Sequence, residues 1–453
     1  MDGGRRVGAD RAAPLRAALK RLVGTTFSFE AIFALYLYSN ALKYISPFPF
    51  PVDETLVFAA LAALVGTFIV LRQGIYRPAL ELLALILIFL GWVLVTWSWS
   101  PSRVLAKAYM TAYLTLDLFS VIAAGFVIAP SRERIARLFL WTSVWAIVIA
   151  AYGSWLYLNY GFIMFYKDFA FGGRAYLRWG YGVAFGAVVL FAITIFSRFL
   201  SGKQLVAGAF LVLCTYFVFV SGSRGALLGF ALGCLILLLG SGRFWRAGRL
   251  QVTTSQVIAF LVLLIAAGYV TWMVIEGTTT QSIGRFVKLF RQAEDPSVIL
   301  SANRFSYYAF ALKAWLQAPI LGNGLGSFSI LYGNREIVGT QPHNAFLEIL
   351  AEYGLVGLVL FLSVLGYVFG RVRRSGMQRD PMMLTLMAMF AVQFVNAMVA
   401  RELSGQMGLF TMLGLLIAAP ALARTAAHSP ADGPSRALPA AVGSPPFWVR
   451  WQA

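Results

Sequence analysis

One long polar stretch, from Glu276 to Asn344, contains the residues of this chain that are best suited to chemistry. It ends in Gln341-Pro342-His343-Asn344, and His343 is the only histidine outside the C-terminal tail. Histidine titrates near neutral pH, so it is a natural general base for a hydroxyl proton. Arginines of the same stretch can bind an anionic group through their planar forks. These residue types predict a group transfer onto a hydroxyl, with an anion held beside the base.

Arg224 is a second candidate, in the segment Ser221-Gly222-Ser223-Arg224-Gly225 between two apolar runs. The glycines allow a sharp turn and leave backbone amides exposed. The positive end of the helix that begins here adds to the charge of the arginine. We therefore expect Arg224 to bind a phosphate or pyrophosphate. The ordinary alternative is an interfacial arginine whose charged end reaches lipid headgroups.

Residues 302–317 predict an amphipathic helix that lies on the membrane surface. Its apolar stripe has helical spacing and consists of Phe305, Tyr308, Ala309, Leu312 and Leu316. Arg304 falls in the first turn, where a cation opposes the helix dipole, so we interpret it as an anion-binding residue. The alternatives are a headgroup contact or an ion pair with Glu294 or Asp295.

Four further residues are predicted to contact the substrate: Arg285, Arg291, Glu348 and Arg401. Glu348 and Glu352 are four residues apart on the helix that Asn344 is expected to cap. Carboxylates buried at such a depth are costly, so they usually form pairs or have a function. Arg401 is followed by Glu402, and an ion pair between them is the ordinary alternative.

The composition predicts an all-α polytopic membrane protein. Of the 453 residues, 60% are hydrophobic and only 12% are charged, and the mean hydropathy is +0.76. Soluble domains average about 45–50% apolar and about 25% charged residues. We predict twelve transmembrane helices from the apolar runs, at 27–46, 54–71, 78–99, 104–129, 135–159, 180–200, 204–220, 225–241, 255–275, 345–370, 382–400 and 406–423. Cys214 and Cys234 fall inside these runs, and no His/Cys cluster suggests a metal site.

The distribution of Lys and Arg predicts the orientation. Twenty-three of the 37 fall in segments on the same side as the N-terminus, and 14 fall on the other side. The more basic side should be cytoplasmic, so the loop 276–344 should lie outside the cytoplasm. We expect a basic cytoplasmic N-terminus at 1–26 without signal-peptide features, a transmembrane domain at 27–423 and a disordered cytoplasmic tail at 424–453.

Three segments resemble the O-antigen ligase/polymerase superfamily of bacterial envelopes. The first is Ser221-Gly222-Ser223-Arg224-Gly225-Ala226. The second runs from Asn303-Arg304-Phe305 to Pro319-Ile320-Leu321-Gly322-Asn323-Gly324-Leu325-Gly326. The third begins with Gln341-Pro342-His343-Asn344-Ala345-Phe346-Leu347 and continues to Glu352-Tyr353-Gly354-Leu355-Val356-Gly357. Together they cover roughly residues 205–370.

The resemblance implies a GT-C-like fold in the inner membrane, catalysis in the periplasm and an undecaprenyl-pyrophosphate-linked glycan donor. It implies no metal and no cofactor. Arg224 and Arg304 match the essential arginines of the superfamily, and His343 matches its essential histidine. Arg285 is a weaker match, because the loop before Arg304 varies in length within the superfamily.

We therefore expect an O-antigen ligase-type glycosyltransferase that moves a glycan onto lipid A-core oligosaccharide with inversion. His343 would be the base, and Arg224 and Arg304 would bind the pyrophosphate. A polymerase that joins lipid-linked repeat units is the alternative within the superfamily. Two further alternatives are a metal-dependent oligosaccharyltransferase that uses Asp53 or Glu54, and a lipid-linked sugar transporter or flippase. Membrane lipids are expected as partners and nucleic acids are not.

Overall fold

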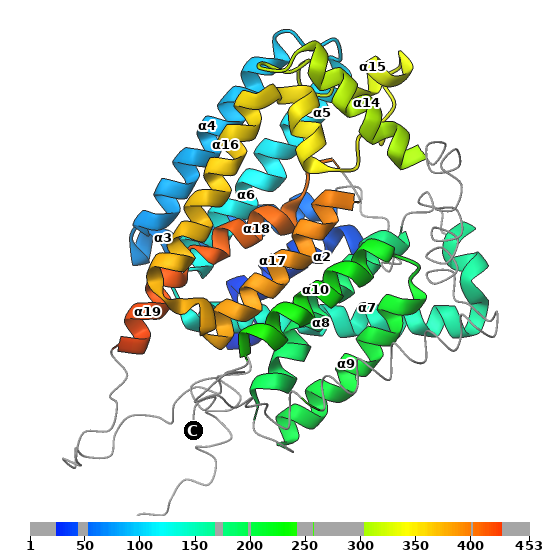
Figure 1. Ribbon diagram of the computed structural model, residues 1–453. Helices are drawn as coiled ribbons and strands as arrows, with labels where there is room; N and C mark the ends of the chain where they lie inside the picture. Colours follow the sequence, from blue (N-terminus) through cyan, green and yellow to red (C-terminus); the bar gives the residue numbers. More distant parts are fainter. Residues whose placement is uncertain are drawn as a thin grey trace, which may run out of the picture.

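The computed structural model describes residues 24–43, 53–167, 175–197, 201–241, 257, 303–399 and 402–427. This part of the chain is helical and contains no strand (Figure 1). The predicted cytoplasmic N-terminus lies outside it up to residue 23, as does the predicted tail from residue 428 onward.

Nine helices among the described residues are long and apolar enough to cross a membrane. Eight of them are α3 (Glu54–Gln73), α4 (Arg77–Trp97), α7 (Arg132–Lys167), α8 (Ala175–Phe196), α9 (Gly202–Val220), α10 (Arg224–Ser241), α16 (Ala345–Ser375) and α17 (Pro381–Val399). The ninth, Val104–Ile128, is built from α5 (Val104–Ala112), η1 (Tyr113–Asp117), α6 (Leu118–Ile122) and η2 (Ala123–Ile128). The prediction of a multi-pass, all-α membrane protein is confirmed.

The remaining three predicted spans differ from expectation or lie outside the described residues. The run 27–46 forms α2 (Phe29–Leu42), which has only 14 residues. The run 406–423 forms two short helices, α18 (Met407–Leu416) and α19 (Ala419–Ala427). The run 255–275 lies outside the described residues except for Val257. The count of twelve full spans therefore stays a prediction.

Ion pairs gather at one end of the helical bundle. The carboxylate of Glu30, near the start of α2, accepts from Arg134 and Arg137 at the start of α7, at 3.3 and 3.0 Å. Arg132 pairs with Asp380 at 2.9 Å, just before α17. These basic residues belong to the loops that the sequence predicts to be cytoplasmic. Acidic partners therefore neutralise part of the positive charge that sets the orientation.

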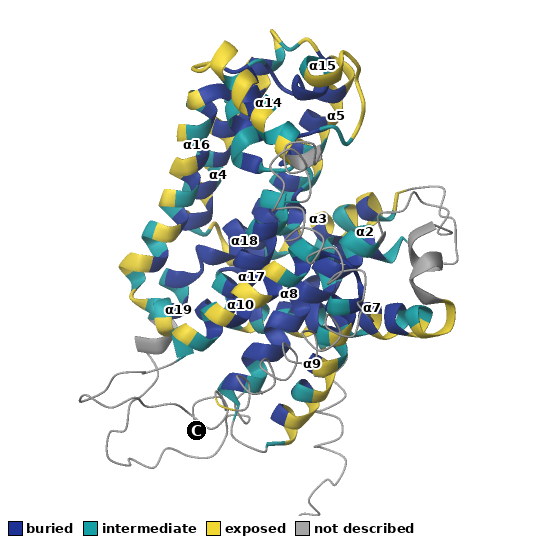
Figure 2. Ribbon diagram, turned by 45° about the vertical axis from the view of Figure 1, so that its right-hand side comes forward, coloured by how far each residue is buried: buried dark blue, intermediate teal, exposed yellow. Residues whose placement is uncertain are grey.

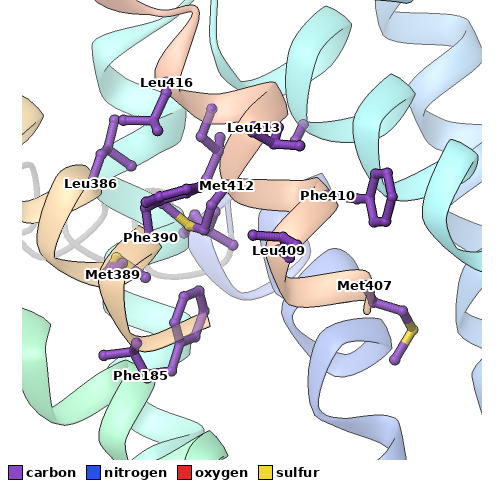
Figure 3. Packing of buried hydrophobic residues seen from close by; sticks show 14 of the residues in the cluster. Phe185, Leu386, Met389, Phe390, Met407, Leu409, Phe410, Met412, Leu413 and Leu416 are labelled. Carbon is purple, nitrogen blue, oxygen red and sulfur yellow. The ribbon is translucent and has the colours of Figure 1, made fainter. Parts of the chain in front are cut away.

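The centre of the bundle consists of α8, α17 and α18, which are buried along most of their length (Figure 2). Apolar side chains from α17 and α18 pack against each other there, among them Leu386, Phe390, Leu409 and Met412 (Figure 3). Large apolar side chains such as Leu64, Leu71 and Leu239 are instead exposed on the periphery. An apolar periphery around a packed interior is the arrangement that a surrounding bilayer requires.

Helix α16 is broken at Gly354, which has φ 65° and ψ −165°. A break in a membrane helix frees backbone groups that have no water nearby, so another part of the protein must satisfy them. Here the segment 319–324 does so. The amides of Leu355 and Val356 donate to the carbonyls of Pro319 and Ile320, at 2.9 and 3.2 Å.

The exchange of hydrogen bonds also runs in the other direction. The amides of Asn323 and Gly324 donate to the carbonyls of Ala351 and Glu352, at 3.0 and 2.9 Å. The two backbones approach so closely that a Cβ at Gly354 would collide with the carbonyl of Ile320. The segment 319–324 thus completes the hydrogen bonding of α16 and fixes the position of the half-helix that starts beside His343.

We call this exchange of backbone hydrogen bonds between α16 and the segment 319–324 the interlock. It predicts that Gly354→Ala destabilises the protein strongly. The alanine would carry a side chain at positive φ and collide with backbone atoms, which are harder to displace than a flexible side chain. Gly370→Ala is the matched control on the same helix, because its Cβ would meet no atom within 4 Å. Thermal unfolding in detergent should show a large loss for Gly354→Ala and none for Gly370→Ala. Equal melting temperatures for the two variants would contradict the interlock.

Candidate functional site

His343 lies immediately before α16 and has an unusual backbone conformation. Its φ is 55°, in the left-handed region that residues other than glycine seldom adopt. Such a conformation costs on the order of 1–3 kcal/mol and is found most often at functional sites. Asn344 caps α16 as predicted, because its side chain accepts from the amides of Phe346 and Leu347, both at 3.1 Å. The cap and the strained residue together fix where the imidazole lies.

Two short helices cover the start of α16, namely α14 (Asn303–Gln317) and α15 (Phe328–Gly333) (Figure 1). The ring of Tyr307 on α14 lies 5.9 Å from the His343 ring, between centroids. Arg304 precedes Tyr307 by three residues, which is about one helical turn. The structure thus brings the first turn of α14 and His343 to the same place, although about 40 residues separate them in the chain.

The predicted helix at 302–317 is confirmed as α14, and it has two apolar faces. Tyr307, Phe310, Ala311 and Ala314 pack toward α15 and α16. The stripe identified from the sequence faces elsewhere, because Phe305, Leu312 and Leu316 are exposed. That stripe is free to contact a membrane surface, as the sequence predicts.

Arg224 is the first residue of α10, and the predicted break between the helices is confirmed because α9 ends at Val220. A Cβ at Gly180 of α8 would lie 2.9 Å from Cβ of Ser223, and a Cβ at Gly225 would collide with the Tyr181 hydroxyl. The small residues around Arg224 thus allow close packing against α8. The sequence predicts a different role for these small residues, namely a turn whose exposed amides bind an anion, and that role stays a prediction.

Buried carboxylates hold the loop 402–406 in place. Glu348 is only 1% exposed, and both of its carboxylate oxygens accept from the amide of Leu403, at 3.1 and 3.0 Å. Asp117 is fully buried, and its Oδ2 accepts from the amide of Gly405 at 2.7 Å. The irregular backbone of this loop lies deep in the protein, where amides need such acceptors. The predicted substrate contact of Glu348 stays a prediction beside this structural bond.

Glu352 has a similar role for the loop that precedes α15. Its Oε2 accepts from the amide of Gly326 at 2.8 Å, and its Oε1 accepts from the amide of Phe328 at 3.3 Å. The sequence marked Glu348 and Glu352 as a pair on one helix face. It could not show that each carboxylate binds the backbone of a different loop.

Glu336 was not singled out from the sequence, yet it connects the segment before His343 to α5. Its Oε1 accepts from the hydroxyl of Ser102 at 2.6 Å and from the amide of Val104 at 3.3 Å. The Ser102 hydrogen bond lowers the pKa of the Glu336 carboxyl below its usual range. A carboxylate at a helix N-terminus is favourable, so Glu336 fixes this loop at the start of α5.

Three predicted substrate-binding residues, Arg285, Arg291 and Arg401, lie outside the described residues. In the part of the chain that the structure describes, no three His, Cys, Asp or Glu side chains are grouped so that they could hold a metal ion. Metal independence stays a prediction, as do the roles of these three arginines.

The carboxylate bonds predict that Glu348→Ala lowers stability, because the buried amide of Leu403 would lose its acceptor at a cost of about 1–3 kcal/mol. Glu348→Gln keeps one acceptor oxygen and should cost less. Glu133→Ala is the control, since Glu133 is an exposed partner in a surface ion pair. Thermal unfolding in detergent measures all three. If Glu348→Ala melts with the wild type but loses donor binding, Glu348 is a substrate contact and not a structural residue.

Comparison with known proteins identifies one family that this chain resembles. Residues 209–362 match a family model described as O-Antigen ligase. The matched segment runs from within α9 to the middle of α16. The matched segment contains Arg224, Arg304, His343 and the interlock at Gly354. No curated protein matches the chain. The match supports a function of the O-antigen ligase or polymerase type, and it confirms the resemblance of this chain to the O-antigen ligase superfamily.

Proposed function

We propose that this protein is a glycan ligase of the bacterial inner membrane. It would move a glycan from undecaprenyl pyrophosphate to lipid A-core oligosaccharide on the periplasmic face. The observation that carries the proposal is the contact between His343 and Tyr307, one turn from Arg304. Base and arginine, far apart in sequence, belong to neighbouring elements inside the segment that matches the ligase family.

In the proposed reaction, His343 takes the proton of an acceptor hydroxyl as its oxygen attacks the anomeric carbon of the donor. A new glycosidic bond forms, and the bond from that carbon to the pyrophosphate oxygen breaks. The electron pair and the negative charge leave with the undecaprenyl pyrophosphate. A single direct displacement of this kind inverts the anomeric configuration.

The pyrophosphate needs positive charge in the bound state and more of it as it leaves. Arg224 and Arg304 are proposed to supply this charge, because guanidinium forks match phosphate oxygens in pairs. Arg285, Arg291 and Arg401 are proposed to add to the same basic surface. This arrangement would require no metal ion or cofactor.

The structure also bears on the transporter alternative. Such a protein would use a charge buried at mid-membrane, and Asp117 is the candidate in the sequence. Asp117 is engaged with the amide of Gly405, so it has a structural task that needs no transported sugar. A polymerase would share the chemistry described above, and it differs only in the acceptor. Transfer to purified lipid A core separates the two, because a polymerase would lengthen the glycan on its lipid carrier.

We predict that His343→Ala slows transfer by roughly 10²–10⁴-fold while donor binding stays nearly unchanged. Arg224→Ala should weaken both donor binding and transfer, because the pyrophosphate is charged before and during the reaction. Arg224→Lys should restore only part of the loss, since an ammonium cannot form a bidentate fork. Donor binding and single-turnover transfer, measured in the same lipid, test these expectations.

Arg72→Ala is the control for loss of one positive charge, because Arg72 lies in the last turn of α3, at the end that is predicted to be cytoplasmic. It should leave both binding and transfer unchanged. If His343→Ala transfers glycan at the wild-type rate, the base mechanism is wrong.

The orientation of α16 provides a separate prediction. Arg335 is exposed in the loop between α15 and this helix, and Arg373 is exposed in the last turn of the helix. Arg335→Cys should react with a membrane-impermeant thiol reagent in intact spheroplasts, whereas Arg373→Cys should react only after permeabilisation. The native Cys214 and Cys234 are buried and should contribute little background. The opposite labelling pattern would place the site on the cytoplasmic side.

A further inference from the structure

A cavity of about 110 Å³ lies where α2, α8, α17 and the start of α18 meet. One water needs about 10–15 Å³ of such space, so the cavity has room for a group of several non-hydrogen atoms. Its polar lining consists of one arginine, four carboxamides and two tyrosines: Arg178, Asn40, Gln393, Asn396, Gln406, Tyr38 and Tyr181. Apolar side chains, among them Leu37, Leu177 and Met407, complete the wall.

Two of these carboxamides have unused hydrogen-bonding capacity. Gln393 is only 8% exposed, and its side chain is wedged against Gly408, where a Cβ would collide with it. Among the residues that the structure describes, neither Gln393 nor Asn40 has a side-chain hydrogen-bond partner. Asn396 and Gln406 bond to each other at 3.2 Å instead. The Gln393 carboxamide lines the cavity without a hydrogen-bond partner among the described residues, so a ligand there would find a free donor and a free acceptor.

The cavity adjoins the candidate site on two sides. Tyr181, which lines it, fills the space against Gly225, the residue after Arg224. Gly405, which also lines it, is held by Asp117, and the same loop is held by Glu348 in the first turn of α16, five residues after His343. A ligand in the cavity would therefore lie next to the residues that are proposed to hold the pyrophosphate.

The lining has the chemistry of sugar recognition. Each carboxamide offers two N–H donors and an acceptor oxygen, which suits hydroxyl and acetamido groups. The residues with free capacity are neutral, whereas a pyrophosphate would favour arginine forks. The apolar wall suits the carbon face of a pyranose and the methyl of an acetamido group. We propose that this cavity binds the sugar that is joined to the pyrophosphate of the donor and that this sugar carries an acetamido group, with Gln393 and Asn40 as specificity-determining residues.

The proposal rests on the proposed function, and binding to two lipids tests it without turnover. The probes are undecaprenyl pyrophosphate and undecaprenyl pyrophosphate that carries one N-acetylglucosamine, presented to the purified full-length protein without acceptor. The wild type should bind the sugar-bearing lipid about tenfold more tightly, the effect of one or two hydrogen bonds worth about 0.5–1.5 kcal/mol each. Gln393→Met and Asn40→Leu should each remove most of this gain and leave the affinity for the sugar-free lipid unchanged.

Gln378→Met is the matched control, because Gln378 lies in the connection between α16 and α17 at the far end of the bundle. It should bind both lipids as the wild type does. Equal binding of the two lipids by the wild type would overturn the cavity proposal and leave the ligase intact. Failure to bind either lipid would overturn both.

The variants must also separate recognition from folding. A Gln393→Met protein that loses affinity for both lipids equally, with a lower melting temperature, would show that Gln393 serves packing and would overturn its assignment. Asn40→Leu then decides whether the cavity binds sugar, because Asn40 is only half-buried at the end of α2 and its substitution disturbs less of the interior.

Discussion

The arrangement around His343 depends on one exchange of backbone hydrogen bonds inside the membrane protein. Helix α16 breaks at Gly354, and the segment 319–324 supplies the partners that the helix itself no longer provides. Without them, four backbone groups would be buried in apolar surroundings, each at a cost of several kcal/mol. The same bonds fix the loop after α14 against the N-terminal half of α16. The positions of α14 and His343 therefore follow from the break in α16.

Side chains extend this interlock to neighbouring elements. The indole N–H of Trp92 donates to the carbonyl of Tyr353 at 2.9 Å, and that of Trp99 donates to the carbonyl of Gly322 at 3.1 Å. Trp92 lies near the C-terminal end of α4, and Trp99 lies in the connection that follows this helix. Glu352 then binds the next loop at Gly326 and Phe328. Side chains from several elements thus hold the non-helical backbone of this region in one conformation, which is the condition for a preorganised site.

Charged groups have different tasks at the two ends of the bundle. At the end with Glu30 and Asp380, arginines pair with carboxylates on neighbouring helices. Around His343, the buried carboxylates Asp117, Glu348 and Glu352 bind backbone amides instead. Acidic groups in this region are thus used to fix loops, and the basic residues of the matched segment are proposed to hold the anionic donor. A site built this way suits a substrate with negative charge.

Much of this protein follows from its sequence because the bilayer imposes simple rules on composition. Apolar runs of about 20 residues predicted the nine helices that, among the described residues, are long and apolar enough to cross a membrane. The Gly/Ser interruption before Arg224 predicted the break between α9 and α10. Local chemistry also gave α14 and the cap at Asn344. Those features depend on residues close together in the chain. The short α2 and α18 were not foreseen, since hydropathy measures how apolar a segment is and not where its helix ends.

Only the tertiary structure decided the break at Gly354, the task of each buried carboxylate and the composition of the cavity. Each depends on contacts between distant residues. The amide of Gly405 donates to Asp117, which is 288 positions away in the sequence, and the amide of Gly326 donates to Glu352, which is 26 positions away. A glycine or a glutamate in an apolar run looks the same whether it faces lipid, a loop or a ligand. Its role is set by which backbone group or side chain folding brings opposite to it.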